Sequence, residues 1–185
     1  MNQLVVATFY KFVELPDYIN LRKPILCLCG QFGLQGTLLL APEGINGTIV
    51  GAREGIDAMC KWLQNDSRLA CLEYKESLVD AKTLPFYRMK VKIKKEIVSF
   101  GVPGISPKMK VGRYVRPEDW NELIHDPETT IIDARNNYEY EVGSFKGAVN
   151  PNTRTFREFP KWADENLNPK KQKKVAMFCT GGIRC

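Results

Sequence analysis

Apolar and polar positions follow two different patterns along the chain, and the first pattern predicts a mixed sheet with two helices. Residues 4–13 are rich in Val, Phe, Tyr and Thr, which favours a strand. The apolar runs 34–40 and 45–51 are separated by a short turn, which is typical of an antiparallel hairpin. Helices are expected over 16–29, before two glycines, and over 52–66. The second helix has apolar residues at helical spacing: Ile56, Met59, Cys60 and Leu63.

Further strands over 72–79 and 87–99 complete the first part of the chain. The order strand, helix, strand, strand, helix, strand, with one added strand, matches the ferredoxin-like split βαβ plan. We therefore expect an α+β ferredoxin-like domain over residues 1–100. Glycine and proline are dense over 101–107, which predicts a linker that we place at 101–115.

The second pattern alternates helices with short apolar strands. Strands are expected over 129–134, 147–150 and 174–178, and helices over 117–125 and 156–166. Such alternation predicts a parallel sheet, and therefore an α/β domain over residues 116–185.

One predicted strand carries an unusual concentration of positive charge. Four cations, Arg88, Lys90, Lys92 and Lys94, alternate with the apolar residues Met89, Val91 and Ile93. Because side chains of a strand alternate between the two faces, all four cations should share one face, with the apolar set towards the helices. No acidic residue occurs over 83–94. This face is either a solvated outer surface or a surface that contacts the phosphates of a nucleic acid.

Composition and charge narrow the class of protein. The net charge is +6, and residues 1–110 hold 15 Lys and Arg against 10 Asp and Glu. Apolar runs fall far short of the ~20 residues that a membrane-spanning helix needs, and the N-terminus lacks the features of a secretion signal. Six scattered cysteines and a single histidine favour neither a disulfide scaffold nor a zinc site. We therefore expect a cytoplasmic protein that does not contact membranes, and no cofactor-binding motif is identifiable.

The candidate chemistry lies directly after the last predicted strand. Cys179 stands at its carboxyl end, where parallel α/β sheets place their sites. The glycine pair that follows allows successive N–H groups to point inward and stabilise a thiolate. We expect Cys179 to be the catalytic residue. The anion-binding loop would comprise Thr180, Gly181, Gly182, Ile183 and Arg184.

These residues resemble a known family. Residues 179–184 match the Cys-x-x-Gly-x-Arg active loop of rhodanese domains, and residues 131–135 resemble the strand of that family that ends in Asp-x-Arg. Residues 143–150 resemble its Gly-His-Ile-x-Gly-Ala-x-Asn segment, with Ser144 where histidine is usual. Asp133 and Arg135 are expected to tie the end of the sheet to nearby loops. His125 is expected to cap its helix or to be solvated.

The first half of the chain makes the resemblance more specific. Ala-Pro-Glu-Gly-Ile-Asn-Gly-Thr at 41–48, Pro-Phe at 85–86 and the basic strand, joined to a rhodanese-like domain, resemble the bacterial tRNA uridine hydroxylases. The resemblance implies 5-hydroxylation of the wobble uridine of tRNA, with molecular oxygen as co-substrate. It also implies Cys179 as a persulfide-type catalytic residue and tRNA as the partner, contacted by the basic first domain.

Two alternatives remain open. The first is a sulfurtransferase that carries sulfur from thiosulfate as a Cys179 persulfide, which needs only the loop. The second is a non-enzymatic RNA-binding module, since a fold alone does not determine a function. Rhodanese domains continue past the loop into a helix, whereas this sequence stops at Cys185. The interpretation is a truncated chain, with activity belonging to the full-length protein.

Overall fold

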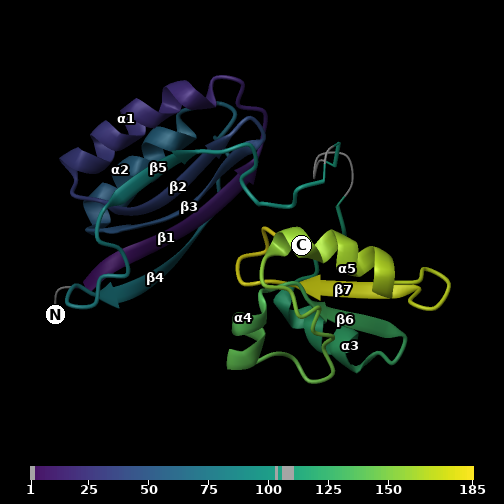
Figure 1. The fold of residues 1–185 in the computed structure, drawn as a ribbon. Coiled ribbons are helices and arrows are strands. Elements are labelled where there is room, and N and C mark those ends of the chain that lie inside the picture. Colours follow the sequence, from purple (N-terminus) through teal and green to yellow (C-terminus); the bar gives the residue numbers. More distant parts are fainter. Residues whose placement is uncertain (1–2, 103, 106–110) are drawn as a thin grey trace. The chain divides into compact units, whose positions relative to one another are not determined.

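A computed structural model describes residues 3–102, 104–105 and 111–185. The chain forms two compact units, Met1–Ile97 and Val98–Cys185 (Figure 1). Part of the expected linker, residues 103 and 106–110, lies outside the described residues. Within the part of the chain that is described, no helix has the length and apolar character needed to cross a membrane.

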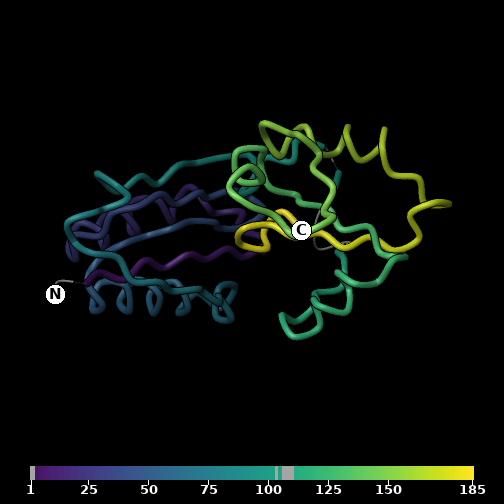
Figure 2. The backbone as a smooth tube through the Cα atoms, turned by 90° about the horizontal axis from the view of Figure 1, so that it is seen from below, coloured from purple at the N-terminus to yellow at the C-terminus, as the bar shows by residue number. Residues whose placement is uncertain are grey.

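The first unit is a five-stranded sheet with two helices. Its strands are β1 (Gln3–Phe12), β2 (Gln35–Ala41), β3 (Gly44–Gly51), β4 (Tyr74–Asp80) and β5 (Met89–Ile93), and its helices are α1 (Tyr18–Gln31) and α2 (Arg53–Gln64). The strand order is β4-β1-β3-β2-β5, with β2 and β3 paired as an antiparallel hairpin and β5 parallel to β2. Figure 2 shows the coil of α2 running along one side of the strands. The expected ferredoxin-like fold is confirmed.

One face of this sheet packs against both helices and forms the core. Phe9, Leu38 and Ile49 are buried there against residues of α1 and α2. All four apolar residues that define the expected periodicity of α2 are buried. Helical spacing in the sequence therefore identified the buried face of α2 correctly, because residues three and four apart lie on the same side of a helix.

Strand β5 is shorter than the run 87–99 suggested. It ends at Ile93, one residue before Lys94 donates a last backbone hydrogen bond to Leu40 O at 2.8 Å. Strand β2, its neighbour in the sheet, ends at Ala41, so the chain beyond Lys94 has no strand to pair with. The end of β5 therefore depends on its pairing partner, which the sequence of this run does not reveal.

The segment 41–48 holds the end of the first unit in place. The Glu43 carboxylate accepts the Ile97 N–H at 2.6 Å, and the Asn46 side-chain amide donates to Ile97 O at 2.8 Å. Gly44 has φ of +144°, and a Cβ atom there would lie 2.0 Å from Lys11 O. Only glycine fits at that position without displacing the neighbouring backbone. This segment therefore has a structural role.

In its described residues, the second unit contains a pair of parallel strands with three short helices. Strand β6 (Thr129–Asp133) pairs with β7 (Lys174–Phe178), and Ile132 forms a single parallel bridge with Val149. The helices are α3 (Trp120–His125), α4 (Asn137–Val142) and α5 (Phe159–Asn166). The expected strand over 147–150 is thus reduced to one bridge. The parallel α/β arrangement itself is confirmed.

Helix α5 covers one face of the β6–β7 pair. Phe159 of this helix is buried with Ile132 and Ala134, and Met177 and Cys185 pack against them. On the other face, Phe178 contacts Phe145 edge-on, with ring centroids 4.7 Å apart. Each expected helix of this unit begins as a 3-10 turn, at Pro117–Asp119 and at Phe156–Glu158. Helix α5 and the aromatic rings thus pack against the two faces of the strand pair. The loop that begins at Cys179 follows the carboxyl end of β7.

Candidate active site

The Cys179 thiol lies inside a loop that curls around it. Cys179 follows β7 directly, and its Sγ atom accepts the backbone N–H of Gly182 at 3.1 Å and of Arg184 at 3.4 Å. Gly182 has φ of +80°, a conformation that glycine adopts without strain and that turns the N–H groups inward. The six residues from Cys179 to Arg184 are therefore brought together as one loop around the sulfur atom.

The surroundings of Cys179 favour its charged form. The pKa of Cys179 is lowered to about 5, with the hydrogen bond from the Cys185 thiol as the largest cause. Burial opposes this shift, while backbone N–H groups of the loop and the charge of Arg184 assist it. The pKa of Cys185 is raised, because its proton is held in the hydrogen bond to the Cys179 thiolate. Cys185 is thus part of the site.

Glu139, a carboxylate that sequence reasoning missed, binds two side chains of the Cys179 loop. Glu139 of α4 accepts both terminal nitrogens of Arg184, at 3.0 and 3.1 Å, and also accepts the Thr180 hydroxyl. The side chains of Arg184 and Glu139 are only 16% and 14% exposed. The Arg184 charge is therefore directed at Glu139, and the contact of Arg184 with sulfur is made by its backbone N–H. The only local signal was the spacing Asn136-x-x-Glu139, typical of a helix start.

A second buried carboxylate fastens the end of β6. Asp133 has a fully buried side chain and accepts hydrogen bonds from the Arg135 guanidinium, at 2.7 and 2.8 Å. Ser144 donates its hydroxyl to the same carboxylate at 2.8 Å, at the position where rhodanese domains usually have histidine. Arg135 also donates to Gly143 O at 2.6 Å. These contacts tie the sheet end to the loop at 143–144, as the sequence suggested.

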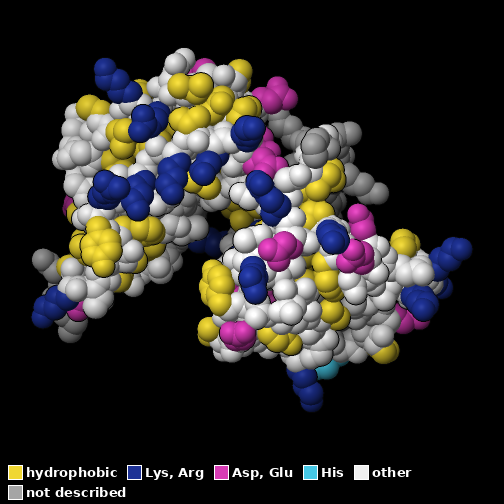
Figure 3. Space-filling view, viewed as in Figure 1, with side chains coloured by type: hydrophobic (Ala, Val, Ile, Leu, Met, Phe, Trp, Pro, Cys, Tyr) yellow, Lys and Arg dark blue, Asp and Glu magenta, His cyan; other side chains and the backbone are white. Residues whose placement is uncertain are grey.

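The four cations of the basic strand lie in the first unit, away in the sequence from the Cys179 loop. Lys90 and Lys92 are exposed on β5, and Arg88 and Lys94 are exposed just beyond its two ends. Val91, between them, is buried in the core, as alternation predicts, although Ile93 is 37% exposed. Figure 3 shows the result, a row of Lys and Arg side chains over β5.

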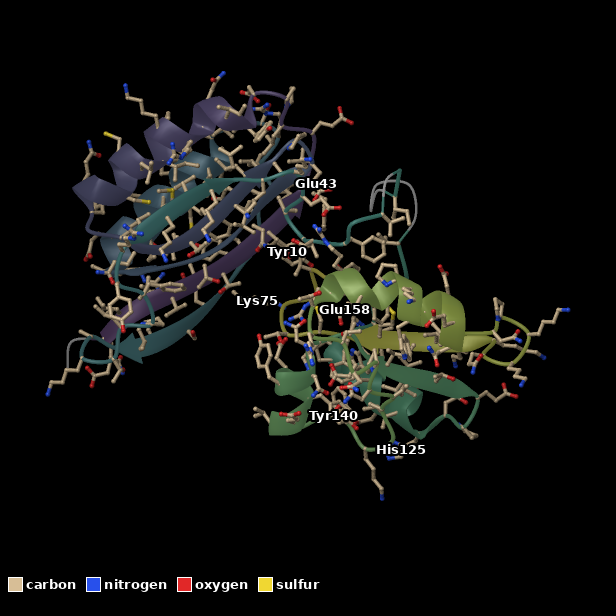
Figure 4. The ribbon with its side chains drawn as sticks, viewed as in Figure 1. Tyr10, Glu43, Lys75, His125, Tyr140 and Glu158 are labelled. Atoms are coloured by element: carbon tan, nitrogen blue, oxygen red, sulfur yellow. The ribbon has the colours of Figure 1, made fainter. Side chains whose placement is uncertain are left out.

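His125 and the other four cysteines lie outside the Cys179 loop. His125 is exposed at the end of α3, and one ring nitrogen lies 2.7 Å from Asn121 O (Figure 4). Cys29 and Cys60 are buried, and burial raises the pKa of each to about 11. Cys27 and Cys71 are exposed. Within the described ranges, no group of three or more His, Cys, Asp or Glu side chains is arranged to hold a metal ion.

The chain is similar in sequence to a known protein over its whole length, and parts of it are similar to solved structures. A tRNA uridine(34) hydroxylase from Teredinibacter turnerae is 56% identical over all 185 residues, and the chain spans 57% of the length of that relative. Among solved structures, an acylphosphatase from Coxiella burnetii is similar with a TM-score of 0.35 at 10% identity, covering 49% of this chain and 94% of its own. The dark-state structure of BlrB, a BLUF protein, gives a TM-score of 0.43 at 20% identity, over 69% of this chain and 89% of its own.

Two protein families match consecutive parts of the sequence. Residues 116–185 match the rhodanese-like domain, which contains the Cys179 loop. Residues 4–97 match the UPF0176 acylphosphatase like domain, which contains the five-stranded sheet and the basic strand. The chain therefore belongs to the UPF0176 family, with its acylphosphatase-like domain followed by a rhodanese-like domain.

Proposed function

We propose that this protein is an enzyme that hydroxylates the wobble uridine of tRNA at carbon 5, with molecular oxygen as co-substrate. The observation that carries the proposal is the 56% identity, across the whole chain, to a protein named tRNA uridine(34) hydroxylase. The aligned region spans both domains, so it includes the Cys179 loop and the basic strand together. Action on tRNA would place the protein in the cytoplasm.

Cys179 is the catalytic residue of this proposal. A thiol with a pKa of about 5 is ionised at neutral pH, and the thiolate is the nucleophilic form of cysteine. The N–H groups of Gly182 and Arg184 that hold the thiolate would also hold negative charge on a group attached to sulfur. Glu139 fixes the Arg184 side chain and so keeps the loop closed around the sulfur.

Analysis of tRNA nucleosides tests the proposal. A strain lacking the gene should lose 5-hydroxyuridine, and the full-length protein should restore it. The Cys179→Ser protein should fail to restore it, whereas Cys71→Ser, a change to an exposed thiol in the other unit, should succeed. Normal 5-hydroxyuridine in the deletion strain would contradict the proposal.

Sulfur transfer is a second candidate, favoured by the environment of the Cys179 thiolate. The thiolate would attack the outer sulfur of thiosulfate, forming a new S–S bond, while the old S–S bond breaks and sulfite leaves with its electron pair. Cyanide would then take the sulfur as thiocyanate and regenerate the thiolate. Full-length protein incubated with thiosulfate should gain one sulfur on Cys179. Turnover with cyanide and unchanged tRNA would favour this function over hydroxylation.

A non-enzymatic role in RNA binding makes a different prediction. If the rhodanese-like domain served only interactions, Cys179→Ala would leave every tRNA modification intact while the protein still bound tRNA. The nucleoside analysis identifies hydroxylation, and the thiosulfate and cyanide assay then separates sulfur transfer from a non-enzymatic role.

A further inference from the structure

The sheet of the first unit has a face that neither helix covers. Strand register assigns side chains to this face, because residues paired across neighbouring strands point to the same side. Val5, Ala7 and Phe9 of β1 point to the helices, so the residues between them point the other way. We call this side the helix-free face. Its strand positions are Leu4, Val6, Thr8, Tyr10, Phe12, Gln35, Thr37, Leu39, Asn46, Thr48, Val50, Lys75, Ser77, Val79, Lys90 and Lys92.

Charge is divided sharply between the two faces of the sheet. None of these described strand positions of the helix-free face is Asp or Glu, and three of them are Lys. The acidic residues of β4, Glu76 and Asp80, alternate to the opposite face. There Glu76 accepts both terminal nitrogens of Arg53 from α2, at 2.6 and 2.8 Å. The helix-free face is thus left with uncompensated positive charge among its strand residues, and suits a polyanion.

Strand register also aligns the side chains of this face in rows that run across the strands. One row reads Tyr10, Asn46, Leu39, Lys92, and the next reads Lys75, Thr8, Thr48, Thr37, Lys90. Thr8 and Thr48 are hydrogen-bonded through their hydroxyls at 2.9 Å. Each row ends in a lysine of β5, while hydroxyl and amide groups occupy the middle of the sheet. The face therefore offers cations at its edges and hydrogen-bonding groups between them.

Two aromatic rings lie at one end of β1. Tyr10 and Phe12 both point to the helix-free face, with ring centroids 6.2 Å apart and ring planes at 71°. Figure 4 shows Tyr10 near the end of β1, and Lys75 on the neighbouring strand β4. Aromatic rings on an open sheet stack the unpaired bases of single-stranded RNA, whereas paired bases are not available for stacking. An aromatic pair beside lysines is suited to an unpaired nucleic acid strand.

We propose that the helix-free face binds single-stranded RNA, with bases stacked at Tyr10 and Phe12 and phosphates held by Lys90 and Lys92. The identity of that RNA as the anticodon loop of tRNA rests on the proposed function. Strands β1 and β5 are three strand spacings apart, about 14 Å, so the RNA must cross the strands to reach both groups. Phosphate contacts at β5 would supply affinity, and stacking would supply the preference for unpaired bases.

Binding to two RNA probes tests the face. Fluorescence anisotropy with the full-length protein would compare an unmodified anticodon stem-loop transcript with a fully paired duplex of equal charge. The Lys90→Ala/Lys92→Ala protein should bind the stem-loop about tenfold or more weakly at low salt, and its salt slope should fall by roughly 1.4. A matched control is Lys23→Ala/Lys61→Ala, which removes two exposed charges from the helices and should bind like wild type.

The aromatic pair is tested separately. Tyr10→Leu should weaken binding of the stem-loop at least about fivefold, with the salt slope and duplex binding unchanged. The proposal is overturned if the double lysine variant binds like its control, or if Tyr10→Leu binds the stem-loop like wild type. Circular dichroism would establish that each variant is folded. Failure of the proposed function would appear as normal 5-hydroxyuridine in the deletion strain and would leave these binding results unaffected, so the two failures are distinguishable.

Discussion

Cys185 should control the pH at which Cys179 becomes reactive. The hydrogen bond from the Cys185 thiol is the largest cause of the lowered Cys179 pKa, and two backbone N–H groups add to it. Cys185→Ala removes that donor and should move the Cys179 pKa upward. Cys185→Ser keeps a hydroxyl donor and should leave the pKa closer to that of the wild type.

The size of the effect depends strongly on the pH chosen. At about pH 5.5, a thiol of pKa about 5 is roughly 2,000-fold more ionised than one of the ordinary value, 9.0. A thiolate of lower pKa is a weaker nucleophile, by about 60-fold over this range, which leaves a net advantage of roughly 40-fold. At about pH 7.5 the gain in ionisation is only about 30-fold, and the advantage disappears. A measurement of reactivity at neutral pH alone would therefore not reveal the lowered pKa of Cys179.

Alkylation by iodoacetamide across a pH series measures this directly. Full-length protein would be quenched at intervals, and the cysteine-containing peptides quantified by mass spectrometry, with the exposed thiols Cys27 and Cys71 as internal references. Cys179 should dominate at acidic pH in the wild type and in Cys185→Ser, and lose that dominance in Cys185→Ala. Superimposable profiles for wild type and Cys185→Ala would show that the backbone N–H groups suffice and would refute the reasoning.

Three further outcomes follow from the structure. The stability advantage of wild type over Cys179→Ser should be complete above pH 9 and lost as pH falls through about 5, because the folded state lowers the thiol pKa; urea unfolding at several pH values would measure it. Glu139→Gln should cost roughly 2–3 kcal/mol in the same assay, since it leaves the mostly buried Arg184 charge unpaired; a loss below 0.5 kcal/mol would count against the pair. Gly44→Ala should cost about 3 kcal/mol or more through its contact with Lys11 O, whereas Gly30→Ala, in helix α1 with open space around it, should be neutral or slightly stabilising; equal effects would contradict the steric argument.

Periodicity in the sequence correctly predicted which side chains are buried at several positions of α2 and β5. The spacing of Ile56, Met59 and Leu63 identified the buried side of α2, and alternation along β5 identified Val91 as buried and Lys92 as exposed. Both predictions depend only on the repeat of a helix or a strand, and tertiary packing did not override them. The thiol-centred loop was also predictable, because a strand, a cysteine and two glycines are adjacent in the chain.

Contacts between distant residues could not be predicted in this way. Glu139 and Arg184 are 45 residues apart, and Asn46 and Ile97 are 51 apart. Nothing in the local pattern of either partner indicates the other. Glu139, Arg184 and Asn46 are polar residues that would be equally at home in solvent, and Ile97 contributes only its backbone carbonyl. The early end of β5 has the same origin, because it depends on where β2 ends. The two contacts and the end of β5 all depend on which distant segments the fold brings together.

The shared proton of Cys179 and Cys185 gives the two thiols a fixed order of reaction. As long as Cys179 is a thiolate, Cys185 retains its proton and is the poorer nucleophile. Once an uncharged group is attached to Cys179, the negative charge that held this proton is gone, and the Cys185 pKa must fall towards the value that burial alone sets. Modification of Cys179 by an uncharged group therefore makes Cys185 more acidic than it is beside the thiolate, while burial still holds its pKa above the ordinary value.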